Sequence, residues 1–249
     1  MSVYFGIVTF IFGTIIGSFL NVCIYRVPRG ESIVYPPSHC TNCNNSIKWY
    51  DLIPIISYIF LRGKCRYCNK HIPIRYPIVE LVTGLLYVMI YIKFGFGIEF
   101  AKYIVFTSIM IVIGMIDLDT TDVYFKISVI GVFLAVIFLA VYHYNGLSII
   151  NYIYGGALGG GLLAFIIVVT KGGMGWGDME ICLICGLFLG FKLTFVMLFF
   201  SFIIGALIGV LLILSKKKSA KDYIPFGPFV AIAAIFTMLC GQNILNLYL

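Results

Sequence analysis

The chain alternates between long apolar stretches and short polar segments. A helix that crosses a bilayer needs about 20 predominantly apolar residues. The pattern therefore predicts an all-α polytopic membrane protein with about eight transmembrane helices, seven being the alternative count. The sixth helix is short for a span, so it must be tilted, extended by the glycine-rich stretch before it, or partly re-entrant. The predicted helices are Val3–Tyr25, Tyr76–Phe94, Ile98–Ile116, Val123–Tyr144, Ile149–Thr170, Met179–Gly190, Leu193–Leu214 and Pro225–Tyr248.

Composition supports residence in a lipid bilayer. The chain is 61% hydrophobic and 11% charged, whereas soluble domains have about 25% charged residues. The formal net charge of +7 would suit nucleic acid, but the basic residues lie in short stretches between apolar segments, as topology signals do. We therefore expect no nucleic acid partner. The first apolar stretch has no basic residue before it and no small-residue cleavage site after it, so we expect a retained helix.

The basic residues predict the orientation. Residues 26–75 hold eight of the 17 Lys and Arg residues, and a second loop holds four more. With eight helices both loops lie on one side, which the positive-inside tendency makes cytoplasmic. We expect a first transmembrane helix (1–25), a small cytoplasmic domain (26–75) and a transmembrane core (76–249). The second basic loop contains Lys216, Lys217, Lys218 and Lys221.

The polar segment carries two cysteine pairs, Cys40–Cys43 and Cys65–Cys68, each with two residues between the cysteines. Two such knuckles provide four thiolates for a tetrahedral zinc ion. A domain of about 50 residues has a small core, so the metal would stabilise its fold. With four cysteine ligands the site would be structural and not catalytic. The alternatives are disulfides, disfavoured in the cytoplasm, reduced thiols, or a ligand role for His39 or His71.

Two further cysteines, Cys182 and Cys185, have the same spacing but lie in an apolar helix without a second pair nearby. Free cysteines commonly pack as small apolar residues. We interpret these two, together with Cys23 and Cys240, as packing residues.

Carboxylates at membrane depth are costly and mark functional sites. Asp117 closes the third predicted helix, and Asp178 opens the sixth after the glycine-rich stretch 172–177. Two carboxylates that meet at the cytoplasmic edge would share a proton. One would activate water while its protonated partner donates to a scissile carbonyl. From spacing alone, solvated helix caps are the alternative.

The other acidic residues have simpler interpretations. Asp119 lies about 200° around the helix from Asp117, so we expect it, like Asp122, to be a solvated loop charge. Glu180 should pair with a basic residue, and Glu80 with Arg75. The glycines of the fifth helix predict close helix packing; they are Gly155, Gly156, Gly159, Gly160 and Gly161.

An ordered series of motifs extends over nearly the whole chain, and with it the chain resembles the bacterial type IV prepilin peptidases. These are GxGD-type intramembrane aspartyl proteases. They are bifunctional leader peptidase/N-methyltransferase enzymes of pilus and type II secretion systems. The motifs are Gly17-Ser18-Phe19-Leu20-Asn21-Val22, Tyr25-Arg26-Val27-Pro28, the two cysteine pairs, Trp49-Tyr50-Asp51, Ile53-Pro54, Leu61-Arg62-Gly63-Lys64-Cys65, Arg75-Tyr76-Pro77-Ile78-Val79-Glu80, Ile116-Asp117, Gly175-Trp176-Gly177-Asp178 and Ile224-Pro225-Phe226-Gly227-Pro228.

The resemblance implies that Asp117 and Asp178 form the catalytic pair in the bacterial cytoplasmic membrane. Its substrates would be type IV prepilins or pseudopilins, cut at the cytoplasmic face after the glycine that ends a short basic leader. The new N-terminus would then be methylated with S-adenosylmethionine. The resemblance links methylation to the cytoplasmic loop, but no nucleotide-binding fingerprint appears there, so the residues that contact the methyl donor are unknown.

Two departures from the family pattern stand out. Tyr124 and Phe125 replace a usual Pro-Asp, so the fourth helix is expected to begin differently, and the first cysteine pair lacks its common proline. We also hypothesise that Asp119, Asp122 and Glu180 attract the basic leader. The competing functions are a GxGD protease acting on another membrane substrate without methylation, and a non-enzymatic zinc-loop membrane protein or transporter.

Overall fold

The computed structural model describes residues 2–216, 219 and 224–248, and its elements there are helices, two isolated β-bridges and loops. This confirms the all-α fold class. Most of the second basic loop, including Lys217, Lys218 and Lys221, lies outside the described residues. The helices are α1 (Ser2–Arg26), α2 (Ile56–Phe60), α3 (Arg75–Phe94), α4 (Ile98–Thr120), α5 (Phe125–Tyr144), α6 (Ile150–Val169), α7 (Trp176–Leu189), α8 (Phe191–Leu214) and α9 (Gly227–Tyr248), with 3₁₀ turns at Val27–Arg29 and Trp49–Leu52.

Seven of the described helices are long and apolar enough to cross a membrane, namely α1, α3, α4, α5, α6, α8 and α9. The chain is therefore a multi-pass membrane protein. The eighth predicted segment is helical too, as α7, but it has only 14 residues and is about 21 Å long, against about 30 Å for a hydrocarbon core. It is also deeply buried, since Ile181, Cys182, Ile184 and Cys185 have no exposed surface.

Two helix ends differ by three residues or more from the sequence prediction, which placed the ends at the limits of the apolar residues: α4 ends at Thr120 and α7 begins at Trp176. Helix α4 continues past Ile116 because the Thr120 hydroxyl donates to the Ile116 carbonyl at 2.9 Å and the Thr121 N–H donates to the Asp117 carbonyl at 2.8 Å. Asp117 therefore lies inside α4, and Asp178 is the third residue of α7. The polar residues at these ends therefore extend each helix beyond its apolar stretch.

The chain divides into two compact units, with the boundary between Ser108 and Ile109 inside α4. In unit 1, α1 and α3 pack antiparallel through small residues. A Cβ on Gly13 would lie 2.8 Å from the Cα of Gly84, and a Cβ on Gly17 would lie 2.8 Å from the Cα of Glu80. Only glycine allows backbones to approach this closely, as is common between membrane helices.

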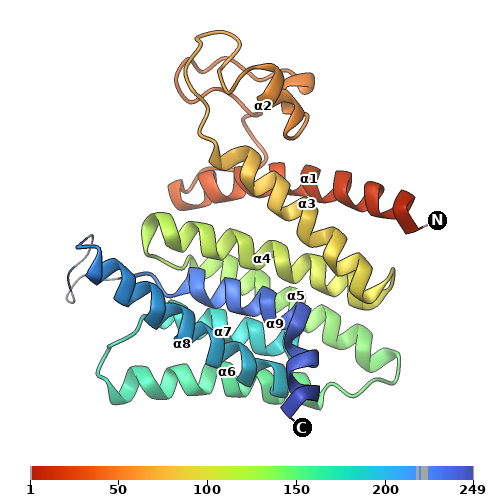
Figure 1. Ribbon diagram of the computed structural model, residues 1–249, viewed down its shortest axis with the longest axis vertical. Coiled ribbons are helices and arrows are strands. Elements are labelled where there is room, and N and C mark those ends of the chain that lie inside the picture. Colours follow the sequence, from red (N-terminus) through yellow and green to blue (C-terminus); the bar gives the residue numbers. More distant parts are fainter. Residues whose placement is uncertain (1, 217–218, 220–223, 249) are drawn as a thin grey trace. The chain divides into compact units, whose positions relative to one another are not determined.

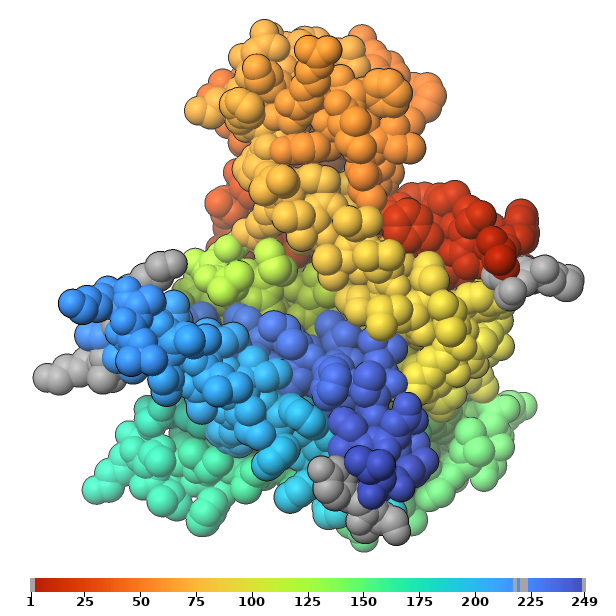
Figure 2. All heavy atoms as spheres, viewed as in Figure 1, coloured from red at the N-terminus to blue at the C-terminus, as the bar shows by residue number. Residues whose placement is uncertain are grey.

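The segment between α1 and α3 forms a compact lobe of unit 1 (orange in Figures 1 and 2). In this lobe the sequence predicts one short helix, capped by Asp51 and running to Arg62, with Gly63 as its stop. That expectation was wrong: the segment contains a 3₁₀ turn and then α2, with Ile55 at a φ of 62° between them. The Asp51 carboxylate binds Arg66 instead of capping a helix.

Unit 2 is built around α7, which packs antiparallel against α6. A Cβ on Gly155 would overlap the Gly186 carbonyl oxygen, and one on Gly159 would overlap the Cys182 carbonyl oxygen. The predicted glycine-mediated helix packing is thus confirmed. Cys185 is buried and its Sγ lies 3.5 Å from the Met110 Sδ of α4, which agrees with a packing role.

Contacts at the two ends of α7 give its direction within unit 2. At its start, a Cβ on Gly177 would lie 2.5 Å from the Cβ of Val123, in the segment after α4. At its end, the Phe191 N–H donates to Asn151 Oδ1 in the first turn of α6 at 3.2 Å. Helix α7 therefore starts at the end of unit 2 where α4 finishes and ends beside the start of α6.

Candidate active site and metal centre

Asp117 lies near the C-terminal end of α4 and is 2% exposed. Its Oδ2 accepts a hydrogen bond of 2.8 Å from the backbone N–H of Gly227, the first residue of α9. A Cβ on Gly227 would lie 2.5 Å from this oxygen and 3.1 Å from Cδ1 of Ile181 in α7. The absence of a side chain at Gly227 thus lets three helices meet at the carboxylate.

Asp178 lies in the first turn of α7 and is 4% exposed. Its Oδ2 accepts a hydrogen bond of 3.3 Å from the Gly175 N–H, so the carboxylate caps its own helix. Ile181, one turn further along α7, reaches the same glycine as Asp117. The structure thus places both aspartates, buried and on separate helices, at one end of unit 2.

The other carboxylates behave differently from this pair. Asp119 and Asp122 are exposed, as expected of solvated charges. Glu180 presents a buried Oε2 with no hydrogen-bond partner among the described residues, so this oxygen makes no ion pair of the kind we expected. Oε2 of Glu80 accepts a hydrogen bond of 2.7 Å from the Ile55 N–H, a partner that sequence reasoning missed.

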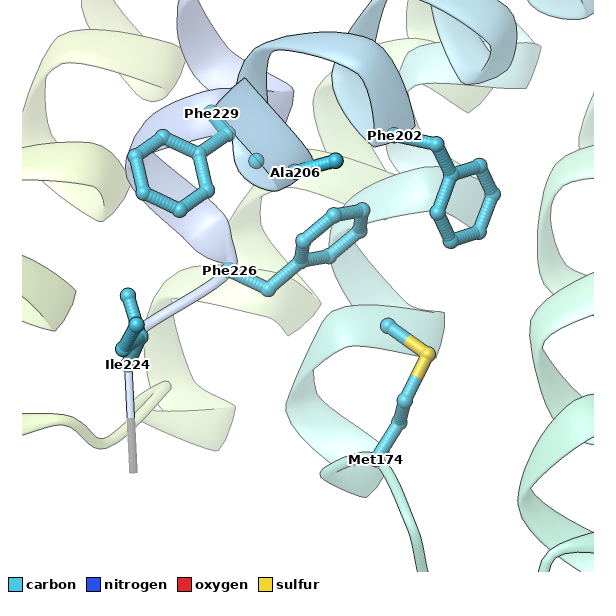
Figure 3. Close-up of a pocket in the computed structure, with 7 residues that line it drawn as sticks. Met174, Phe202, Ala206, Ile224, Phe226 and Phe229 are labelled. Carbon is cyan, nitrogen blue, oxygen red and sulfur yellow. The ribbon is translucent and has the colours of Figure 1, made fainter. Parts of the chain in front are cut away.

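Unit 2 has an apolar pocket of about 310 Å³. Phe226, which precedes Gly227, lies at its centre in Figure 3, with its ring centroid 5.3 Å from that of Phe202. The role of Gly227 was not foreseen, although the motif around it was noted. The pocket is lined by Met174, Phe202, Gly205, Ala206, Ile224, Phe226 and Phe229.

The four cysteines of the loop come together in unit 1. Their Sγ atoms all lie within 4.8 Å of one another, and those of Cys40 and Cys68 are 3.8 Å apart. A tetrahedral zinc ion with Zn–S bonds of about 2.3 Å separates its sulfurs by about 3.8 Å. The donor set and its spacing therefore fit zinc. Among the described residues this metal-compatible group contains no histidine, so His39 and His71 are not part of it.

The two knuckles have the same backbone design. The Cys40 N–H donates to the Asn45 carbonyl at 3.0 Å, and the Cys65 N–H donates to the Lys70 carbonyl at 2.9 Å. Asn44 and Asn69 follow the second cysteine of each pair with φ values of 55° and 56°. Asparagine is among the few residues that adopt this left-handed conformation readily, so each turn directs both sulfurs inward.

An ion pair braces the second knuckle. The Arg66 guanidinium donates two hydrogen bonds to the Asp51 carboxylate, at 2.8 Å from Nε and 2.6 Å from the terminal nitrogen. These bonds hold the pKa of Asp51 below its usual value. Bidentate pairs of this kind fix geometry as well as adding energy, so Arg66 ties the residues between Cys65 and Cys68 to the turn at Trp49–Leu52.

Residues 11–94 match the family described as the Bacterial Peptidase A24 N-terminal domain, and residues 104–210 match the Type IV leader peptidase family. A protein of Bacillus subtilis (strain 168) named prepilin leader peptidase/N-methyltransferase is 34% identical over 97% of this chain and 97% of its own length. The chain belongs to the type IV leader peptidase family.

Other relatives carry the same name. The Aeromonas hydrophila protein is 32% identical over 99% of this chain and 94% of its own length. The Myxococcus xanthus (strain DK1622) protein is 35% identical over 86% of this chain and 65% of its own length. No solved structure is significantly similar to this chain.

The two family matches cover different candidate sites. The four cysteines lie in the part that matches the N-terminal domain, and both aspartates lie in the part that matches the leader peptidase family, a family of membrane aspartic proteases. Membership of the family therefore makes the chain an enzyme.

Proposed function

We propose that this chain is a membrane aspartic endopeptidase that removes the leader of type IV prepilins or pseudopilins and methylates the new N-terminus. The observation that supports this function best is the pair of buried carboxylates, Asp117 and Asp178, at one end of unit 2, within the residues that match the leader peptidase family. The relatives' printed names contain both activities.

In the proposed mechanism the two aspartates share one proton, because two carboxylates that are close together and buried do not both ionise easily. The ionised carboxylate takes a proton from a water molecule, which attacks the scissile carbonyl carbon. The protonated carboxyl donates its proton to the carbonyl oxygen. The tetrahedral intermediate then collapses as the C–N bond breaks. The first carboxyl, which now holds the proton from water, donates it to the leaving amine, and a hydroxyl of the intermediate returns its proton to the second carboxylate.

The surrounding chain positions these groups. The Gly227 N–H occupies one oxygen of Asp117, which leaves the other oxygen for water or the partner carboxyl. Because α7 is only about 21 Å long, against about 30 Å for a hydrocarbon core, Asp178 in its first turn would lie below the membrane surface. The apolar pocket around Phe226 offers space for a non-polar substrate residue.

The zinc ion that we propose for the loop would be held by Cys40, Cys43, Cys65 and Cys68. It would hold the two knuckles together and so stabilise the loop, because four cysteine ligands leave no open position for substrate. Peptide hydrolysis is thus assigned to the aspartates alone.

The orientation and location are part of the same proposal. Residues 26–75 carry eight Lys and Arg residues, which favours a cytoplasmic loop and an active site at the cytoplasmic face of the bacterial plasma membrane. Asp119, Asp122 and Glu180, close to Asp117 and Asp178 in sequence, would attract the basic leader. Neutralising all three should weaken prepilin binding, with the largest effect at low salt.

The test incubates the purified full chain in detergent with a prepilin and tritiated S-adenosylmethionine. We expect a mass loss equal to the leader, a new N-terminus directly after glycine, and label on the cleaved product. Cleavage without label would support a peptidase that lacks methylation, and no cleavage would support a non-enzymatic zinc-loop protein or transporter.

A further inference from the structure

One short stretch of the unit 1 lobe exposes many large apolar side chains. This apolar segment, residues 52–61, contains no charged residue and includes α2. Within it Phe60 is 82% exposed and Ile59 is 67% exposed, and Trp49, just before it, is 78% exposed. The other exposed apolar residues of the segment are Leu52, Ile53 and Ile56. A cluster of this kind marks an interaction surface, whereas single exposed apolar residues are ordinary.

The apolar segment is fixed in place by hydrogen bonds. The Ile55 N–H donates to Oε2 of Glu80 in α3 at 2.7 Å. The Tyr58 hydroxyl donates to the Ile72 carbonyl at 3.4 Å, and the Ile72 N–H donates to the Gly63 carbonyl at 2.8 Å. Ile55 has a φ of 62°, a strained conformation that persists only where the surrounding contacts enforce it. The exposure of the apolar side chains is therefore a property of the fold.

The contact with Glu80 gives the depth of α2 relative to the spanning helix α3. That helix has 20 residues and is about 30 Å long, which equals the thickness of a hydrocarbon core. A tilt would shorten its reach further, so Arg75 at its start lies at the edge of the core. Glu80 lies about 7.5 Å further along the axis. Because Ile55 bonds this carboxyl group, α2 lies close to the boundary between headgroups and acyl chains.

Helix α3 itself presents apolar side chains beside this boundary. Ile78 and Leu81, in its first two turns, are exposed, and so is Ile74, which precedes the helix. On a helix that crosses a bilayer, exposed apolar side chains of this kind face lipid. The surface next to α2 is therefore a lipid-facing one.

Basic residues flank the apolar segment on both sides. Lys48 precedes it, Arg62 and Lys64 follow it, and all three are exposed. The nearest acidic residue before the segment, Asp51, is paired with Arg66. Basic residues beside an apolar stretch suit the phosphates of lipid headgroups, and tryptophan, present here at position 49, is enriched at membrane interfaces.

We propose that the apolar segment inserts the side chains of Ile56, Ile59 and Phe60 into the interface of the bilayer that α3 crosses. The lobe is then held to the membrane at α2 (labelled in Figure 1) as well as at the ends of α1 and α3, which restricts its rotation. This inference uses the fold of unit 1 and the membrane residence of the chain. It does not depend on the proposed peptidase or methyltransferase function.

The first test measures the depth of α2 by fluorescence quenching. The chain has two tryptophans, Trp49 and Trp176; both are replaced by Phe, and Phe60→Trp then supplies a single fluorophore. The full chain is reconstituted into vesicles of phosphatidylcholine and phosphatidylglycerol. Lipid brominated near the headgroup end of its acyl chains should lower the emission about twofold, because interfacial segments insert about 5–10 Å into this region. Acrylamide dissolved in the water should quench weakly.

The matched control carries Ser46→Trp in the same background. Ser46 is exposed, and its neighbours Asn44 and Asn45 are polar, so acrylamide should quench this fluorophore and brominated lipid should not. Three outcomes would overturn the proposal. Equal lipid quenching at both sites means that the lobe has no distinct membrane-facing side. Quenching of the Phe60→Trp chain by acrylamide alone means that α2 faces water. Protection from both quenchers means that protein, such as a second copy of the chain, covers α2.

The second test uses the unaltered chain, so it remains decisive if the substitutions disturb the fold. The vesicles contain phosphatidylcholine with a photoreactive diazirine in its acyl chain, and the peptides labelled on irradiation are identified by mass spectrometry. We expect label on residues 52–61 as well as on α3, and none on residues 38–46. Label on α3 without label on residues 52–61 would show that lipid does not contact the apolar segment.

Discussion

The backbone N–H of Gly227 donates a 2.8 Å hydrogen bond to Oδ2 of Asp117, so the first residue of α9 fixes a carboxylate on α4. Gly227 also has no room for a side chain, because a Cβ would lie 2.5 Å from that oxygen. The geometry of the proposed active site therefore depends on a glycine that carries no chemistry itself.

Gly227→Ala should displace the Asp117 carboxylate. Because a misplacement of about 1 Å at a reacting group costs about 100-fold in rate, we expect kcat for leader cleavage to fall by about that factor, with a smaller change in KM. Overpacking should also lower the free energy of unfolding by about 1–3 kcal/mol. Steady-state cleavage kinetics and thermal unfolding in detergent measure the two effects.

The matched control is Gly161→Ala. This glycine is in α6 of the same unit, and a Cβ there meets no atom within 4 Å. It should leave cleavage unchanged. Equal activity of Gly227→Ala and the unaltered chain would show that the Gly227 contact does not position the catalytic carboxylate.

The cysteine cluster predicts one zinc ion for each chain, measured by inductively coupled plasma mass spectrometry. Cys65→Ser should lose the metal, since it removes one of four thiolates whose Sγ atoms lie within 4.8 Å of one another. Because the small loop depends on the metal for its fold, the same variant should be cut faster within residues 27–74 by added protease. Cys240→Ser, outside the cluster, should keep its zinc, and zinc retained in Cys65→Ser would contradict the assignment.

The Asp51–Arg66 ion pair predicts a small, pH-dependent contribution to the stability of the loop. The pKa of Asp51 is lower in the folded chain than in the unfolded chain. The contribution is therefore present above the ordinary pKa of about 4 and is lost as the pH falls through the lower, folded value. Arg66 is 46% exposed, so we expect about 0.2–1 kcal/mol.

Asp51→Asn tests this by removing the charge at similar size. The difference in unfolding free energy between variant and unaltered chain should be constant from pH 5 to pH 8. Loss of zinc at acid pH affects both proteins alike and cancels in the comparison. A difference that grows steadily over this range would mean that another group is responsible.

Much of the transmembrane architecture could be predicted because apolar periodicity and length determine it. All eight predicted segments are helices, the shortest was recognised as such, and the α6 glycines lie at a close helix contact. The cysteine spacing likewise predicted a cluster of four, since each knuckle is a local structure with its own backbone hydrogen bonds.

What escaped the sequence depends on contacts between distant residues. Asp51 was expected to cap a helix locally, but Arg66 offered it two charged hydrogen bonds. Glu80, for which Arg75 was the expected partner, accepts a hydrogen bond from the distant Ile55 N–H. Neither partner follows from periodicity, and an isoleucine at positive φ has no sequence signal at all.

The central claim is that Asp117 and Asp178 carry out the cleavage, and single Asn substitutions test it most directly. Asp117→Asn and Asp178→Asn keep the size of each side chain but remove the shared proton, so each should lower kcat for leader cleavage by at least about 100-fold. Glu31→Gln, at an exposed site between α1 and α2, is the control and should cleave at the normal rate. If either Asp117→Asn or Asp178→Asn, folded and with its zinc, cleaves prepilin as fast as the control, that aspartate is not catalytic and the mechanism is wrong.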